Sequence, residues 1–118
     1  MTGQVYKILP RESWLTAMGQ GTVALQGVDE KDGFVHLCTA DQLGETLRVH
    51  FAGQENLVVL AFDTDDLGAA LRWEVSRGGQ KFPHFYGRLE TRQVRAQYDV
   101  SADPAGFILP QALTKRSA

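Results

Sequence analysis

The sequence predicts an α+β domain with two short helices in its N-terminal half. Helical periodicity occurs only before residue 53, whereas strand-like apolar runs dominate the rest of the chain. Helices do not regularly separate these runs, which argues against a doubly wound parallel sheet. A length of 118 residues fits one domain spanning the whole chain, 1–118. We expect its core to cover about 4–110 and the tail from Lys115 onward to be frayed.

Local signals place each element in order. The two expected helices are 11–18, which follows Pro10, and 39–52. Thr39 and Gln42 have the spacing of a capping box, which favours a helix start there. Residues 29–33 read as a polar turn, 63–71 as an acidic turn with one helical turn, and 76–81 as a flexible loop. The expected strands are 5–9, 34–37, 56–62, 71–75 and about 93–100.

The strand at 56–62 is a continuous apolar run, so we expect it to be buried on both faces and central in its sheet.

Composition and charge exclude several classes of protein. The formal net charge is −2 with acids and bases mixed, so no extended nucleic-acid surface is expected. No apolar run approaches the roughly 20 residues that span a bilayer. A single cysteine, Cys38, and the lack of a signal peptide favour the cytoplasm. The oligomeric state is not determined by the sequence.

His36 is the first candidate site residue. It ends an apolar strand about one turn before the helix start at Thr39, where free N–H groups favour an anion. The same His could be a structural residue with both ring nitrogens bonded inside the protein. The scattered His and Cys residues lack ligand spacing, so no structural zinc is expected.

A second group of candidates lies later in the chain. Glu74, beside Trp73, could act as an acid or base, or point to solvent. In 82–87 (Phe-Pro-His-Phe-Tyr-Gly), aromatic rings flank His84 and could stack on a planar ligand. The alternative for this segment is an aromatic plug that closes one end of the core.

These segments together resemble the bacterial domain-of-unknown-function 952 family. The resemblance rests on Tyr6-Lys7-Ile8 with Trp14, Asp32 to Thr39 with Gln42, Arg72-Trp73-Glu74, and Phe82 to Gly87. They occur in the expected order and cover the chain to about Val100.

That family is similar in fold to the ADP-ribosyltransferases, especially the RNA 2'-phosphotransferases. The resemblance implies a split, two-sheet fold with a ligand cleft between the sheets, and NAD as the cofactor. Val35-His36-Leu37-Cys38 is similar to the His-Leu-Ser strand of that branch, with Cys38 in place of the serine. Lys7 stands where the branch carries a histidine that helps hold NAD, which weakens the case for NAD.

Three hypotheses follow. In the first, the chain is an ADP-ribosyl- or phospho-transferase whose catalytic candidates are His36, Glu74 and His84. In the second, it is a non-catalytic module that binds a small molecule or nucleotide; in the third, a structural or partner-binding domain. Under the first hypothesis, Lys7 or Arg72 contacts a phosphate. The full set of expected ligand-binding residues is Lys7, Thr39, Arg72, Trp73 and Tyr86.

Overall fold

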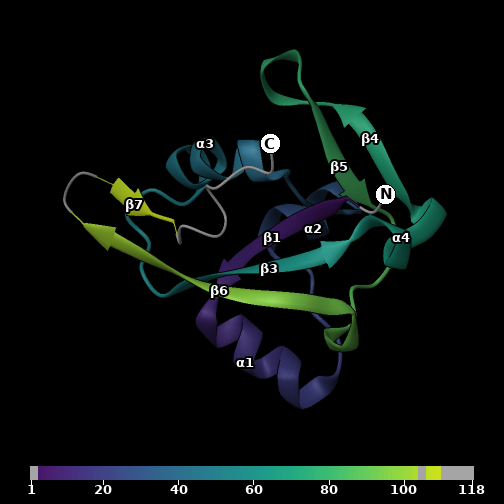
Figure 1. The fold of residues 1–118 in the computed structure, drawn as a ribbon, viewed down its shortest axis with the longest axis horizontal. Helices are drawn as coiled ribbons and strands as arrows, with labels where there is room; N and C mark the ends of the chain where they lie inside the picture. The colour runs from purple at the N-terminus through teal and green to yellow at the C-terminus, as the bar shows by residue number, and fades with distance from the viewer. Residues whose placement is uncertain (1–2, 104–105, 110–118) are drawn as a thin grey trace.

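A computed structural model describes residues 3–103 and 106–109 (Figure 1). Its strands form two antiparallel sheets, with the orders β1-β3-β6-β7 and β2-β5-β4. The strands are β1 Gln4–Pro10, β2 Val35–His36, β3 Leu57–Asp63, β4 Leu71–Val75, β5 Lys81–Phe85, β6 Val94–Asp103 and β7 Gly106–Ile108. The helices are α1 Arg11–Gln20, α2 Gly27–Asp32, α3 Ala40–His50 and α4 Thr64–Leu67, with 3₁₀ turns at Gly68–Ala70, Arg77–Gly79 and Thr91–Gln93. The α+β class and the two-sheet arrangement are therefore confirmed.

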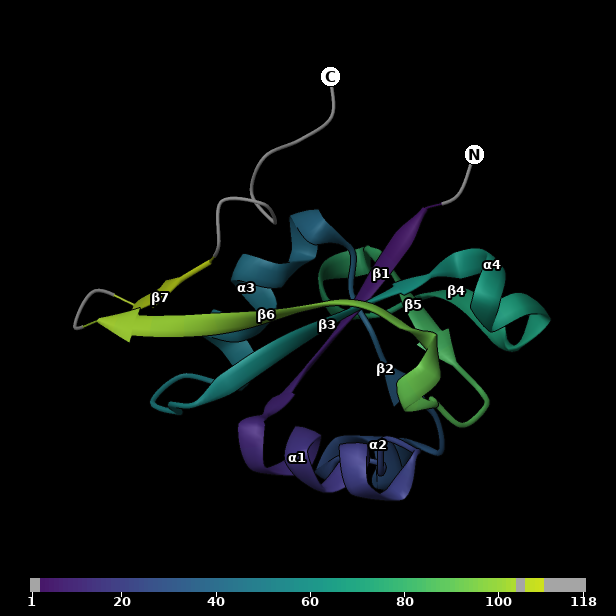
Figure 2. The same cartoon turned by 60° about the horizontal axis from the view of Figure 1, so that its bottom comes forward.

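The larger sheet divides the core into two layers. Strand β3 lies between β1 and β6 and is buried over 57–62, as its continuous apolar run predicts. Its alternate residues face opposite layers. Val58, Leu60 and Phe62 join the layer that contains Trp14 of α1, whereas the layer under α3 contains Leu57, Val59 and Ala61. Figure 2 shows α1 and α2 on one side of this sheet and α3 on the other.

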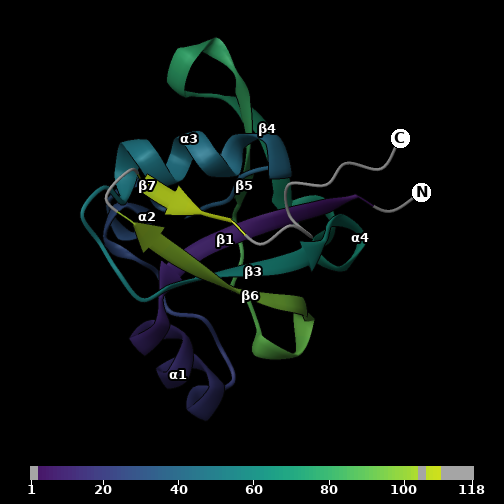
Figure 3. The ribbon, with the colours of Figure 1, turned by 60° about the vertical axis from the view of Figure 1, so that its left-hand side comes forward.

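The two sheets meet at a short contact between β1 and the residues after β2. The Tyr6 N–H donates to the Cys38 carbonyl at 2.8 Å, and the Cys38 N–H donates to the Tyr6 carbonyl at 3.0 Å. The Leu37 N–H in turn donates to the Pro83 carbonyl of β5. Segment 35–38 thus links β1 of one sheet to β5 of the other, and Figure 3 shows β5 crossing β1.

Three elements differ from the sequence-based expectation. Helix α2 occupies the segment expected to be a polar turn, so the N-terminal half holds three helices. Its sequence, GVDEKD, has no apolar face, and its one buried residue is Asp29. Strand β5 was not among the expected strands. Pro83 lacks an N–H, but its carbonyl pairs with Leu37 in the structure. Strand β7, at Gly106–Ile108, was also not expected.

The expected frayed tail from Lys115 onward lies outside the described residues. None of the helices within 3–103 and 106–109 is long and apolar enough to cross a membrane.

Candidate functional site

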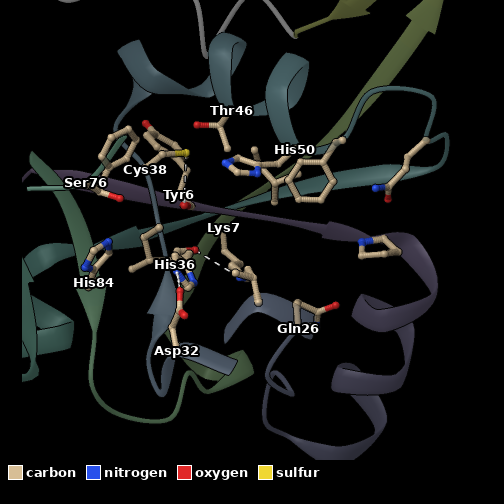
Figure 4. Close-up of a pocket in the computed structure, with 18 residues that line it drawn as sticks. Tyr6, Lys7, Gln26, Asp32, His36, Cys38, Thr46, His50, Ser76 and His84 are labelled. Atoms are coloured by element: carbon tan, nitrogen blue, oxygen red, sulfur yellow. Dashed lines mark hydrogen bonds and ion pairs between the residues drawn. The ribbon is translucent and has the colours of Figure 1, made fainter. Parts of the chain in front are cut away.

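A cavity of about 590 Å³ lies along the edge of β1 that is not paired with β3. We call it the edge cavity. Helix α2 and the strand β2 region border it on one side, α3 borders it on the other, and β5 closes one end (Figure 4). It is lined by Tyr6, Lys7, Ile8, Pro10, Gln26, Gly27, Val28, Asp32, His36, Leu37, Cys38, Thr46, His50, Phe51, Gln54, Ser76, Phe82 and His84.

The β1 edge offers this cavity one free pair of backbone groups. In an antiparallel strand, the N–H and C=O of alternate residues point to opposite edges. Tyr6 bonds Cys38 on the edge away from β3, so Ile8, two residues on, directs its N–H and C=O to the same edge. Within residues 3–103 and 106–109, neither the N–H nor the C=O of Ile8 has a hydrogen-bond partner on this edge. Pro10 comes next on this edge and has no N–H, so the free edge is one residue long.

A buried ion pair supports the wall of the edge cavity. Lys7 Nζ and Asp29 Oδ2 are 2.7 Å apart, and their side chains are 4% and 0% exposed. Lys7 Nζ also donates to the His36 carbonyl at 3.3 Å. The backbone N–H of Gln26 donates to Asp29 Oδ2, and that of His36 to Asp29 Oδ1. Asp29 therefore fastens α2 to both β1 and β2.

Both ring nitrogens of His36 are bonded inside the protein. Nδ1 lies 2.7 Å from Asp29 Oδ1, and Nε2 lies 2.9 Å from Asp32 Oδ2. The side chain is nevertheless 28% exposed and lines the edge cavity. His36 is thus held in a fixed orientation, with its ring rather than a free nitrogen available to a ligand.

The pKa values of the buried pair reflect two opposing effects. Burial raises the pKa of Asp29, but the hydrogen bond from His36 and the charge of Lys7 outweigh it and lower the pKa to about 2. Burial lowers the pKa of Lys7, and the charge of Asp29 offsets part of that decrease. Asp29 is therefore ionised at neutral pH and supplies the counter-charge for the buried ammonium group.

A second side-chain cluster lies at the β4–β5 end of the site. His84 is 5% exposed and lines the edge cavity, and its Nδ1 lies 2.8 Å from Glu74 Oε1. The Tyr86 hydroxyl donates to the same oxygen at 2.7 Å. The hydrogen bonds from Tyr86 and His84 lower the pKa of Glu74, and the bond to Glu74 raises the pKa of Tyr86. An ionised carboxylate only accepts hydrogen bonds, so His84 donates from Nδ1. In the tautomer with its proton on Nδ1, the other ring nitrogen, Nε2, is a hydrogen-bond acceptor.

Phe34 joins the two clusters. Its ring stacks on His84 at 4.2 Å between centroids and lies 4.5 Å from His36 and 5.1 Å from Tyr86. On this side the structure has another cavity, of about 600 Å³, which we call the second hollow. It is lined by Thr22, Val23, Ala24, Leu25, Gly33, Phe34, Val35, Tyr86, Gly87, Arg88 and Leu89.

The structure brings some of the expected site residues together and separates others. Lys7, His36 and His84 line the edge cavity, and Glu74 reaches it only through His84. Tyr86 lines the second hollow. Three expected ligand-binding residues line neither cavity: Thr39, Arg72 and Trp73.

Each of those three has another place in the structure. The Thr39 N–H donates to Gln42 Oε1 at the α3 start, as its capping spacing predicts. The Arg72 guanidinium lies over the Tyr86 ring, 5.1 Å from its centroid. Trp73 is 46% exposed on β4.

Sequence reasoning missed Asp29 and the free backbone of Ile8. In the sequence, Asp29 is one of several acids in an expected polar turn. Of its contacts, only the capping contact with Gln26 joins residues close enough in the chain to be predicted from their spacing. Among the residues that the structure describes, no group of three or more His, Cys, Asp or Glu side chains could hold a metal ion.

Comparison with known proteins supports this description of the fold. The family model described as "Protein of unknown function (DUF952)" matches residues 8–97. A crystal structure of protein CC0527 from Caulobacter crescentus is similar, with a TM-score of 0.89 and 42% identity over 95% of this chain and 99% of that one. A solution NMR structure of CC0527 gives a TM-score of 0.79 and 43% identity over 88% of this chain and 90% of that one. No curated protein matches the chain.

Proposed function

This chain belongs to the DUF952 family of proteins of unknown function. We propose that it binds a small planar amide in the edge cavity and acts as a transferase on a substrate that carries this group. The observation that carries the proposal is the orientation of His84. Its ring lines the cavity, while Glu74 holds Nδ1 at 2.8 Å and leaves Nε2 as the proton acceptor.

The shape of the free β1 edge supports the ligand class. One N–H and one C=O of Ile8 match the C=O and N–H of a single amide group. An extended peptide would need further free groups, but the Tyr6–Cys38 bridge and Pro10 bound this edge on both sides. A ring that carries a carboxamide, such as nicotinamide, fits this pattern.

The fold resemblance supplies the reaction class. In ADP-ribosyl transfer from NAD, the bond between ribose and nicotinamide breaks, and a bond forms between ribose and an acceptor oxygen. The acceptor hydroxyl loses a proton in this step, and we assign that proton to His84 Nε2. General acid–base catalysis of this kind typically contributes 10²–10⁴-fold.

Lys7 and His36 take positioning roles in this proposal. The Lys7 ammonium is neutralised by Asp29, and both ring nitrogens of His36 contact carboxylates. Neither group therefore offers an unpaired cation for a pyrophosphate. Together they hold segment 35–38 against β1, which keeps the cavity wall in place.

The same pairing favours a second candidate, the non-catalytic binding module. A pocket whose cations are neutralised can hold a neutral ring without stabilising charge that develops in a reaction. Turnover distinguishes the two candidates, because a binding module retains the ligand and consumes no NAD.

The test begins with binding. We expect nicotinamide to shift the backbone amide resonance of Ile8 in a ¹H–¹⁵N NMR titration. Nicotinic acid, which lacks the amide donor and is charged, should bind at least about tenfold more weakly, since the Ile8 carbonyl would then lose its partner. No shift with millimolar nicotinamide would refute the proposal.

Turnover is measured next as release of nicotinamide from NAD. We expect His84→Asn and Glu74→Gln to lower the rate by about 10²-fold or more. The matched control is Glu55→Gln, at an exposed residue just before β3, which should leave the rate unchanged. Binding without release of nicotinamide would favour the non-catalytic module.

A further inference from the structure

The second hollow differs in chemistry from the edge cavity. Arg88 is the one charged residue in its lining as described, and Phe34 and Tyr86 contribute aromatic rings. No ion pair of Arg88 is found within residues 3–103 and 106–109, whereas Lys7 in the edge cavity is paired with Asp29. The hollow therefore has a cation that remains available to a ligand.

Its lining leaves room for a flat group beside the rings. Gly33 and Gly87 carry no side chains, and at Gly33 even an added Cβ would meet no atom within 4 Å. Tyr86 is 43% exposed, so one part of its ring is accessible from solvent. An accessible aromatic face favours stacking with a planar ring.

One carboxylate oxygen connects the hollow to the edge cavity. Glu74 Oε1 accepts from Tyr86, which lines the hollow, and from His84, which lines the edge cavity. The Arg72 guanidinium lies over the Tyr86 ring, 5.1 Å from its centroid, and adds positive charge on that face. A change in the Tyr86 hydrogen bond therefore alters the strength of the hydrogen bond between Glu74 Oε1 and His84.

We propose that the second hollow is a separate binding site for a small aromatic anion, a carboxylate or a phosphate ester, and that its occupancy is transmitted to His84 through Tyr86 and Glu74. The anion pairs with Arg88, and its ring stacks on Phe34 or Tyr86. A bound anion that accepts the hydrogen bond from the Tyr86 hydroxyl takes that donor away from Glu74. The carboxylate then interacts with His84 alone.

NMR titrations with benzoate and with phenyl phosphate test this site on the wild-type chain. We expect either probe to shift the backbone amides of 86–88 and the side-chain resonances of the His84 ring. Arg88→Gln should weaken binding at least about tenfold, because it removes the charge-assisted bond. Arg92→Gln, at an exposed residue on the 3₁₀ turn outside the hollow, is the matched control and should bind as wild type.

The outcomes separate this site from the edge cavity. An Arg88→Gln chain that binds benzoate and phenyl phosphate as tightly as wild type would overturn the proposed anion recognition. Shifts at 86–88 without any change at His84, or with the same His84 change in Tyr86→Phe, would overturn the coupling. Benzoate shifts at 86–88 without a nicotinamide shift at Ile8 would refute the proposed function and leave the second site intact; the reverse pattern would overturn the second site alone.

Discussion

The buried pair of Lys7 and Asp29 gives a sharp test of how the site is built. Asp29 accepts four contacts at 2.7–3.0 Å, from Lys7 Nζ, His36 Nδ1 and two backbone N–H groups. The substitution Asp29→Asn removes the counter-charge and turns an NH₂ group toward one set of these donors. Removing one partner of a buried ion pair costs about 3–5 kcal/mol. We expect the free energy of unfolding to fall by that amount, a large fraction of the 5–15 kcal/mol typical of native proteins.

The same carboxyl predicts a pH dependence. Its pKa is about 2 in the folded chain against an ordinary value of 3.8, so folding favours the ionised form. This stabilisation is fully present above about pH 4 and is lost as the pH falls through about 2. At 1.36 kcal/mol per pKa unit it amounts to roughly 2 kcal/mol. We expect wild type to lose this stability between pH 4 and pH 2, whereas Asp29→Asn lacks this part of the acid dependence.

Urea denaturation followed by circular dichroism measures both effects. The matched control is Asp99→Asn, which breaks an exposed pair with Arg11 and should cost no more than about 1 kcal/mol. In a double-mutant cycle, the combination of Asp29→Asn with Lys7→Met should cost less than the sum of the single substitutions, because no unpaired charge remains. An Asp29→Asn cost equal to that of Asp99→Asn, or additive single costs, would refute the description of this pair.

Two further predictions concern β5 and its surroundings. Gly87→Ala should destabilise the chain by about 1–3 kcal/mol, because a Cβ would lie 2.7 Å from the Phe85 ring. Gly44→Ala in α3 has open space around it and should stabilise the chain by roughly 0.5–1 kcal/mol. Thermal melts compare the two variants, and equal effects would contradict the packing of Gly87. Tyr86→Phe removes the strongest influence on Glu74, so the pKa of that carboxyl should rise toward its ordinary value in a ¹³C NMR titration, and an unchanged value would contradict the hydrogen bond.

Much of the fold follows from local patterns. The capping pair of Thr39 and Gln42 predicts the start of α3, and the donor and acceptor lie 3.0 Å apart in the structure. The apolar run at 57–62 predicts a central strand, since only a strand covered on both faces can bury every side chain. The α2 helix has neither an apolar face nor a long periodic pattern, so nothing in its composition distinguishes it from a turn.

The site was less accessible to sequence reasoning. The strand-end position of His36 and the aromatic segment around His84 pointed to residues that both line the edge cavity. Position alone could not show that carboxylates bond both nitrogens of His36 and that Glu74 bonds one nitrogen of His84. Sequence reasoning proposed Lys7 or Arg72 as a phosphate contact, and it could not show that the Lys7 ammonium group has a buried partner, because Asp29 lies 22 residues away.

The sequence by itself therefore determined the α+β class, the central strand and the capped helix start, because periodicity and capping act between residues that are close in the chain. The tertiary structure decided which charges meet and which backbone groups remain free. Asp29 reaches Lys7 only because α2 packs against β1, and Ile8 faces a cavity only because the Tyr6–Cys38 bridge ends there. Such contacts join residues far apart in the chain, and their cost or benefit depends on a burial that no local pattern specifies.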